Sequence, residues 1–490
     1  MKRVMVLMIV AAAVSAGFAQ YRAVDRQAGM MIEGRPFFTD AARYNSYDLA
    51  GSPLGLFDIN SSEKMSVDLG YRYYGLGDET GHYLSGQTIR MGQPGRSFFE
   101  LFYGPDIMSD KNSRYNNNKI SLPLHRFGLT LATQDAEGSF RTSIMAAGYA
   151  GGQEWERGDS SRALMGVEKL RLDMGGRVHP FLRIGFFINF SGHLDTLYVP
   201  GVTDDMRRDC PAQLNLPEFG GNIDFGDDDM PVRSNLSVSY ALSRFVYTSK
   251  WPTGFPPADQ WGNVPPIMGD SLRVAWLTQG EIPVLGDGYV ASPGLLLGYF
   301  GTSGTLHDPH PESNPLQPGP ARPNTDYSLS GFHFGVGAGF KADKYAALHF
   351  EYSAAFMSLE CGSAYPAPEV KSRNLHNVSF GASANLHDYL ELPLEITPRI
   401  AYFISGSARG AGTAHSDLWP MNAAPGRSKQ GLYMPNTYLT GFTRTNGFTF
   451  GIDGLALEEM LSASFWMTFL SHSIIDKGGM ELGLSFGIRM

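Results

Sequence analysis

Long runs in which apolar and polar residues alternate cover much of this 490-residue chain and limit its possible folds more than any other feature. In Gly331–Phe340 every even position is Phe, Val or Ala, whereas the odd positions carry Gly or His. Leu348–Phe356 repeats the pattern, with His349 and Glu351 on the opposite face. A period of two is that of a β-strand, whose successive side chains point to opposite faces. The sequence therefore predicts an all-β fold.

The length and the polar face of these runs help to distinguish a soluble β-sandwich from a membrane barrel. Alternation alone fits both, because the polar face of a soluble sheet points to water. The runs are about 10 residues long, which is the length that a tilted strand needs to cross a bilayer. Their polar faces mix Gly and Ser with single charges of both signs, as expected of a wet barrel interior. We therefore expect a transmembrane antiparallel β-barrel.

The first residues have the pattern of an export signal. Lys2 and Arg3 precede an apolar run at 4–14, and Gly17–Ala19 offers the small-x-small pattern that a signal peptidase cuts. The alternative, a transmembrane anchor, needs about 20 apolar residues, and this run is too short. We expect a signal peptide at 1–19 and a mature protein in the outer membrane of a diderm bacterium. Its expected partners are outer-membrane lipid and the barrel-assembly machinery during biogenesis.

Net charge and cysteine content exclude other classes of protein. The formal net charge of −9 and the pI of about 5.7 leave no basic footprint, so we expect no nucleic-acid partner. Cys210 and Cys361 are too few for a disulfide scaffold, and whether they pair is left open. No cofactor is implied by the sequence.

The number of strands follows from the number of alternating runs and the spacing of their turns. Short turns should recur after every second strand, with long loops between. This phase holds from residue 330 to the C-terminus but slips between residues 190 and 290, so we prefer 14 strands (range 12–16) for a barrel at 64–490. The runs start near residues 65, 97, 126, 139, 164, 181, 235, 271, 289, 330, 347, 376, 394, 446, 461 and 480.

Residues 20–63 do not alternate, yet they carry much apolar surface. A segment of this kind that precedes the first strand is expected to lie inside the barrel as a plug. Phe37, Phe38, Leu54 and Phe57 are our candidates for contact between plug and ligand.

A family resemblance enters at the end of this plug segment. Residues 47–56 read Tyr-Asp-Leu-Ala-Gly-Ser-Pro-Leu-Gly-Leu and precede the alternating run Met65–Tyr74. The stretch resembles the start of the long-chain fatty-acid transport porins (FadL-like), in which an Asn-Pro-Ala-Gly-Leu-like motif ends an N-terminal hatch. The match covers about 30 residues, and Ser52–Leu56 departs from the motif at its first and third positions. The resemblance implies a 14-stranded barrel with an N-terminal plug that passes hydrophobic compounds.

Charged and histidine residues on the inner face are the candidate lumen lining. Together they could form a selective path, or they could be a salt-bridge network that holds the plug to the wall; both interpretations stay open. His333, His349 and Glu351 could meet on neighbouring strands, but no nucleophile can be placed beside them, so we predict neither a catalytic nor a metal site. The inner-face candidates are Asp68, Arg72, Arg183, Arg273, His333, His349, Glu351, Glu395, Arg399 and Asp453.

Two further motifs are interpreted as structural. Gly335–Gly339 lies inside a strand with no helix after it, so it is no nucleotide-binding loop. We expect Asp224 and Asp227–Asp229 in a long loop, where a solvated acidic loop is favoured over a Ca²⁺ site because the spacing matches no EF-hand.

These observations predict a channel or transporter and not an enzyme. The expected cargo is a small, hydrophobic molecule that crosses by diffusion. The alternative is a structural or secretion-associated barrel whose loops bind a partner and whose lumen stays closed.

Overall fold

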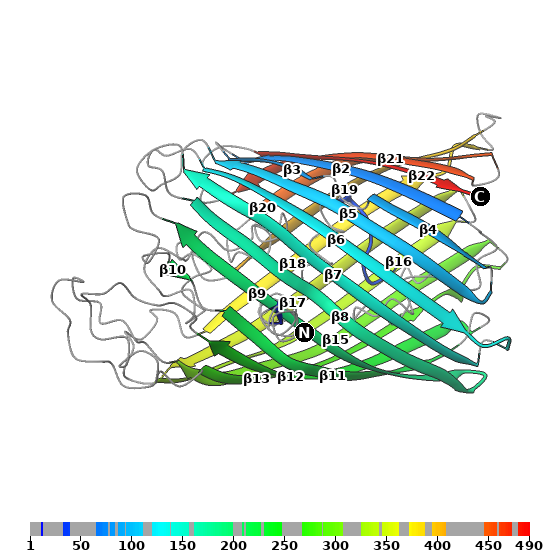
Figure 1. Ribbon diagram of the computed structural model, residues 1–490. Coiled ribbons are helices and arrows are strands. Elements are labelled where there is room, and N and C mark those ends of the chain that lie inside the picture. The colour runs from blue at the N-terminus through cyan, green and yellow to red at the C-terminus, as the bar shows by residue number, and fades with distance from the viewer. Residues whose placement is uncertain are drawn as a thin grey trace, which may run out of the picture.

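A computed structural model of the chain shows one closed antiparallel sheet whose strands are strongly tilted (Figure 1). The signal peptide, apart from Ala11–Ala12, and most of the plug segment, including Leu54 and Phe57, lie outside the described residues. The structure describes residues 11–12, 33–39, 65–76, 79–83, 87–93, 95–110, 120–137, 139–155, 161–198, 208–209, 212–226, 230–246, 267–286, 288–306, 325–342, 345–361, 372–387, 394–407, 445–457, 460–472 and 479–490.

Within these residues the wall has 18 strand positions, one of them shared by β3 and β4, which both pair with β2 and β5. The first half of the wall consists of β2 Met65–Leu76, β3 Glu79–Tyr83, β4 Gln87–Gln93, β5 Ser97–Asp110, β6 Ile120–Gln134, β7 Phe140–Trp155, β8 Ser161–His179, β9 Leu182–Tyr198 and β11 Ala212–Phe225. The second half consists of β12 Val232–Val246, β13 Ile267–Gly280, β15 Tyr289–Leu306, β16 Thr325–Ala342, β17 Ala346–Cys361, β18 Ser372–Ala384, β19 Leu394–Ser407, β20 Thr445–Ala456, β21 Leu461–His472 and β22 Gly479–Arg489. Three two-residue strands, β1 Ala11–Ala12, β10 Arg208–Asp209 and β14 Ile282–Pro283, pair with their neighbours.

The barrel closes where its first wall strand meets its last. β2 and β22 pair from Ser66 opposite Arg489 to Leu76 opposite Gly479, and Figure 1 shows the blue and red strands side by side. Met65 and Met490 exchange two backbone hydrogen bonds of 3.0 and 2.8 Å at the end of this seam. Closure leaves no open sheet edge, which is the condition for a β-sheet to exist in lipid.

The expected number of 14 strands is wrong: all 16 alternating runs are strands, and two further strand positions were missed. β3 and β4 lie where we expected one loop, and β11 lies within the loop expected between β9 and β12. The alternation of β11 is broken by a bulge between Leu216 and Glu218, around Pro217, and by Gly220 and Gly221. Adding these two positions to the 16 expected runs gives the observed wall and removes the slip in turn phase between residues 190 and 290.

The two faces of the wall differ in polarity. On β17, Glu351 and Ser353 are fully buried on the inside, whereas Phe350 and Phe356 are 52% and 41% exposed on the outside. Large exposed apolar side chains recur on most strands, including Phe127, Ile144, Phe186, Phe219, Phe332, Phe380, Phe448 and Phe469. An exposed apolar surface that encircles a protein far exceeds the patches of soluble monomers and fits a lipid-facing wall.

No helix in the described part of the chain is long and apolar enough to span a bilayer.

Candidate functional site

The inner face of the barrel holds a short segment of the N-terminal region, Glu33–Thr39, which we call the inner segment. Its residues precede the wall in sequence but contact side chains from β13 to β21. Phe37, Phe38 and Thr39 are at most 4% exposed. The inner segment is therefore seated against the wall.

Glu351 of β17 holds one end of the inner segment. The backbone N–H of Phe37 donates to both carboxylate oxygens of Glu351, at 2.8 and 2.9 Å. The backbone N–H groups of Phe38 and Thr39 donate to its Oε1 at 2.6 and 3.1 Å. On the other side of the segment, the Gln279 side-chain amide donates to the carbonyls of Phe37 and Phe38 at 3.4 and 3.1 Å. Hydrogen bonds to a buried carboxylate are among the stronger ones in proteins, so this end is firmly fixed.

Glycines on β15 and β16 form a socket for Phe38. A Cβ atom built at Gly335 would lie 2.1 Å from Cζ of the Phe38 ring, and one at Gly294 would lie 2.1 Å from the Phe38 carbonyl oxygen. At Gly337 it would lie 2.8 Å from the Phe38 Cβ. Distances of this kind leave no room for any side chain, so the glycines are required by the close approach of the inner segment. Leu277 and Leu296 complete the socket as a buried apolar cluster with Phe37 and Phe38.

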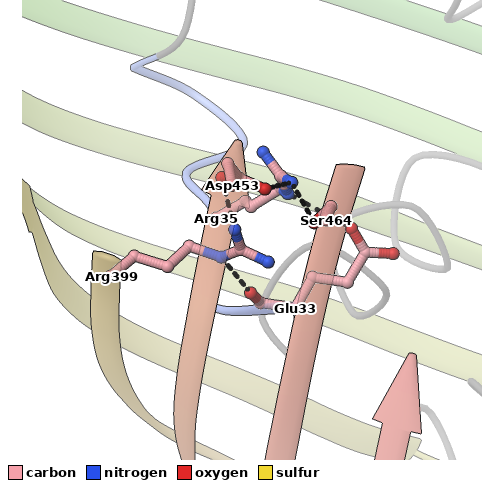
Figure 2. Close-up of polar contacts among 5 residues, drawn as sticks. All are labelled: Glu33, Arg35, Arg399, Asp453 and Ser464. Carbon is pink, nitrogen blue, oxygen red and sulfur yellow. Dashed lines mark hydrogen bonds and ion pairs between the residues drawn. The ribbon is translucent and has the colours of Figure 1, made fainter. Parts of the chain in front are cut away.

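A charged clamp holds the other end of the inner segment (Figure 2). Arg35 donates to Asp453 at 2.6 Å and to Ser464 at 3.1 Å. Arg399 donates to the other oxygen of Asp453 and, through Nε, to the Glu33 carbonyl at 2.9 Å. One wall carboxylate is thus shared by a guanidinium of the inner segment and a guanidinium of the wall.

Gly34 lets the chain pass between these contacts. Its φ of +69° lies in the left-handed region, and a Cβ atom there would stand 3.1 Å from both Ala401 and Thr449. Both the conformation and the space favour glycine at this position.

A second polar network lines the inner face of β8, β9, β11, β12 and β13. Arg171 pairs with Asp173 at 2.7 Å and lies 3.7 Å from the centre of the Phe187 ring. Glu218 accepts from Asn189 at 3.2 Å and from Arg273 at 3.3 Å. In this network each of these carboxylates is satisfied by groups of the wall itself.

Asp224 belongs to this network and not to a loop, which corrects our placement of it. It lies on β11, is 6% exposed, and accepts from Asn222 at 3.0 Å and Asn235 at 2.8 Å. The rest of the expected acidic loop, Asp227–Asp229, lies outside the described residues.

The candidate lumen residues fall into three groups in the structure. Glu351, Arg399 and Asp453 meet at the inner segment, and Arg273 joins the second network. The third group has other surroundings. Arg183 lies on β9 at one of the alternate positions whose side chains point inward. Glu395 accepts from Asn385 at 3.3 Å, and Asp68 accepts from Thr88 at 3.4 Å. The side chain of Arg72 lies outside the described residues.

His333 and His349 do not form a metal group with Glu351. His333 is 6% exposed and its Nε2 has no hydrogen-bond partner, whereas the His349 ring lies over Gly381, with Cε1 2.4 Å from a Cβ built there. Among the described residues there is no cluster of three His, Cys, Asp or Glu side chains placed to hold a metal ion.

Several residues of this site carry no recognisable signal in the sequence. Glu33, Arg35, Gln279 and Ser464 were not singled out, because each is an ordinary polar residue until its distant partner is known. The alternate glycines of Gly335–Gly339 carry a signal, but nothing in the sequence connects them with the apolar pair Phe37 and Phe38. A run of small residues on the inner face of a strand could have indicated a close approach by another segment.

The fold and the two-faced wall define a class: a closed antiparallel β-barrel of the outer-membrane type. No family model matches the chain, and no curated protein matches it in sequence.

Several solved structures are similar. The FrpB iron transporter from Neisseria meningitidis (F3-3 variant) is 8% identical, with a TM-score of 0.40 over 91% of this chain and 83% of its own. A mutant ferric enterobactin receptor from Pseudomonas aeruginosa (PfeA) is 7% identical, with a TM-score of 0.41 over 88% and 82%. Pseudomonas aeruginosa OccK11 (OpdR) is 8% identical, with a TM-score of 0.35 over 89% and 99%. Values of this size carry no information about what this chain binds, and they do not specifically indicate the FadL-like family.

Proposed function

We propose that the protein is an outer-membrane channel for small solutes whose lumen is closed by an N-terminal plug that includes the inner segment. The observation that carries this proposal is the inner segment fixed to the polar inner face of a barrel whose outer face is apolar.

The wall supports the membrane part of the proposal. Its exposed apolar side chains would face lipid, and its buried Asp, Glu, Asn, Ser and Thr side chains face inward. A polar interior inside an apolar exterior is the arrangement that a solute pathway through a bilayer requires.

The contacts of the inner segment support the closing part of the proposal. Glu351 and Gln279 hold one end, and Arg399 and Asp453 hold the other, so the segment follows the wall over the arc from β13 to β21. These fastenings are mostly hydrogen bonds and ion pairs, which water and solutes can replace when the segment leaves. A closure of this kind is reversible in principle, unlike one made only of packed apolar side chains.

The chemistry of the cargo remains a prediction. The preference for hydrophobic molecules came from the FadL-like resemblance, with Phe37, Phe38, Leu54 and Phe57 as candidate ligand contacts, and the first two are buried in their socket. Most of the inner face offers hydrogen-bonding groups, which favours cargo that can form hydrogen bonds over a purely apolar molecule.

The proposal is tested by releasing the inner segment and measuring conductance in planar bilayers. The double variant Arg35→Ala with Glu351→Ala removes a principal contact at each end, and we expect larger steady single-channel currents than for the unaltered protein. The matched control is Lys341→Ala with Glu281→Ala, which removes an ion pair of 2.6 Å between half-exposed side chains at the turn side of the wall. Heat-modifiable gel mobility checks that both variants form barrels. Equal currents from the two double variants would refute the channel and favour the structural barrel with a sealed lumen.

A further inference from the structure

Phe38 presents three chemically different groups to the wall, and each group contacts a matching group of the wall. Its ring lies against Gly335 in the buried cluster with Leu296, and Phe38 is 0% exposed. Its N–H donates to Glu351 at 2.6 Å, and its carbonyl accepts from Gln279 at 3.1 Å. A single aromatic residue thus satisfies an apolar, an anionic and an amide element of the wall together.

The wall groups that contact Phe38 are buried and depend on the inner segment. Glu351 is 0% exposed and Gln279 is 5% exposed. Within the part of the chain that the structure describes, every hydrogen bond to the Glu351 carboxylate comes from residues 37–39 of the inner segment. A buried carboxylate without donors is costly, so when the inner segment leaves, its N–H groups must be replaced by water or by the donors of a ligand.

Three other buried carboxylates of the wall behave differently. Asp173 pairs with Arg171, Asp224 accepts from two asparagines of the wall, and Glu218 accepts from Asn189 and Arg273. These groups need nothing from the lumen. Glu351 is therefore distinguished as a carboxylate whose donors come from a removable segment.

We propose that Glu351, Gln279 and the glycine socket form a ligand subsite, and that the inner segment occupies it as an internal substitute for the ligand. The ligand class follows from the groups of Phe38 that contact the wall. These are an aromatic ring, an amino or amide N–H on the Cα atom two carbons from the ring, and the carbonyl attached to that Cα atom. Short peptides and amino-acid amides with an aromatic residue have these groups. This inference rests on the proposed function, because the ligand can enter only when the plug leaves.

The experiment measures whether such a compound competes with the inner segment in the full-length protein. The reporter is Thr39→Cys in a chain that also carries Cys210→Ser and Cys361→Ser; Thr39 is 4% exposed, so a maleimide reacts there only after release. The probes are phenylalanine amide, alanine amide, which lacks the ring, and 3-phenylpropanamide, which lacks the amine. A ligand that binds only the released form raises its population about tenfold at a concentration near ten times its Kd.

The expected result is faster labelling with phenylalanine amide alone. Glu351→Gln in the reporter chain should abolish the preference for phenylalanine amide over 3-phenylpropanamide, whereas the matched variant Glu218→Gln should keep it. Equal labelling rates with all three probes, or with none, would overturn the subsite. Conductance of the release variant described above separates the two proposals: a conducting variant with no probe effect refutes only the subsite, and a silent variant refutes the channel itself.

Discussion

Gly335→Ala tests the socket most directly, because a single methyl group must enter space that the Phe38 ring occupies. The added Cβ atom would lie 2.1 Å from Cζ of the ring and 2.7 Å from Cε1. The backbone of Phe38 is already close to Gly294, and its ring is packed in the buried cluster with Phe37, Leu277 and Leu296. We therefore expect Phe38 to leave its socket while the strand pairing of β16 persists.

The size of the effect follows from the burial that is lost. Transfer of a buried Phe side chain to water costs about 1.5–3 kcal/mol. Because about 1.4 kcal/mol is a tenfold change in an equilibrium constant, the released fraction of the inner segment should rise by about 10-fold to 150-fold.

The assay is the rate of maleimide labelling in the Thr39→Cys reporter chain, compared with the matched variant Gly298→Ala. A Cβ atom at Gly298, on the neighbouring strand β15, would meet its nearest atom at 3.5 Å, which is an ordinary contact. Labelling in Gly335→Ala that is no faster than in Gly298→Ala, with both barrels folded, would refute the socket.

Three further results are expected. Phe350→Arg places a charge on the lipid-facing side, where it should cost up to about 2–4 kcal/mol of barrel stability, whereas Leu285→Arg at a turn should cost about 0–1 kcal/mol. Urea unfolding in lipid vesicles measures both costs. Equal costs would contradict the membrane-facing belt. Arg171→Ala removes the guanidinium that pairs with the buried Asp173 and should lower the free energy of unfolding by about 3–5 kcal/mol, with a smaller loss when Asp173→Ala is added. A loss in the double variant equal to the sum of the two single losses would show that the pair is not coupled. Arg399→Ala frees the Glu33 carbonyl and one oxygen of Asp453, so it should raise bilayer conductance, and unchanged current would remove the clamp from the closing mechanism.

The direction of side chains along the strands could be predicted from the sequence. Alternation placed Glu351 inside and Phe350 outside on β17, as the structure has them. The signal is strong because each face of the wall meets one kind of surroundings, so a shift by one residue would move every side chain to the wrong face.

The number of strands could not be predicted, because two strand positions lack that signal. β11 contains a bulge at Pro217, and β3 and β4 share one position as short pieces. In each case backbone pairing with long neighbours maintains the strand, and this pairing is invisible in the local sequence.

The seat of the inner segment could not be predicted for a different reason. Phe38 and Glu351 are separated by 313 residues, and Arg35 and Asp453 by 418. Which N-terminal residue meets which wall residue depends on the closed register of the whole barrel, and no local pattern encodes it.

The same separation sets an order on the assembly of the molecule. The inner segment comes before every wall strand in the chain, yet its partners lie on β13, β17, β19, β20 and β21, which are synthesised late. Contacts over such long stretches of chain form slowly, because a large loop must close before they gain anything. The segment can dock only on a wall that already holds these strands in their final register. Docking therefore occurs only after this arc of the wall is complete. An incomplete or misregistered barrel would offer no seat and would leave its own N-terminal region free for quality-control proteases.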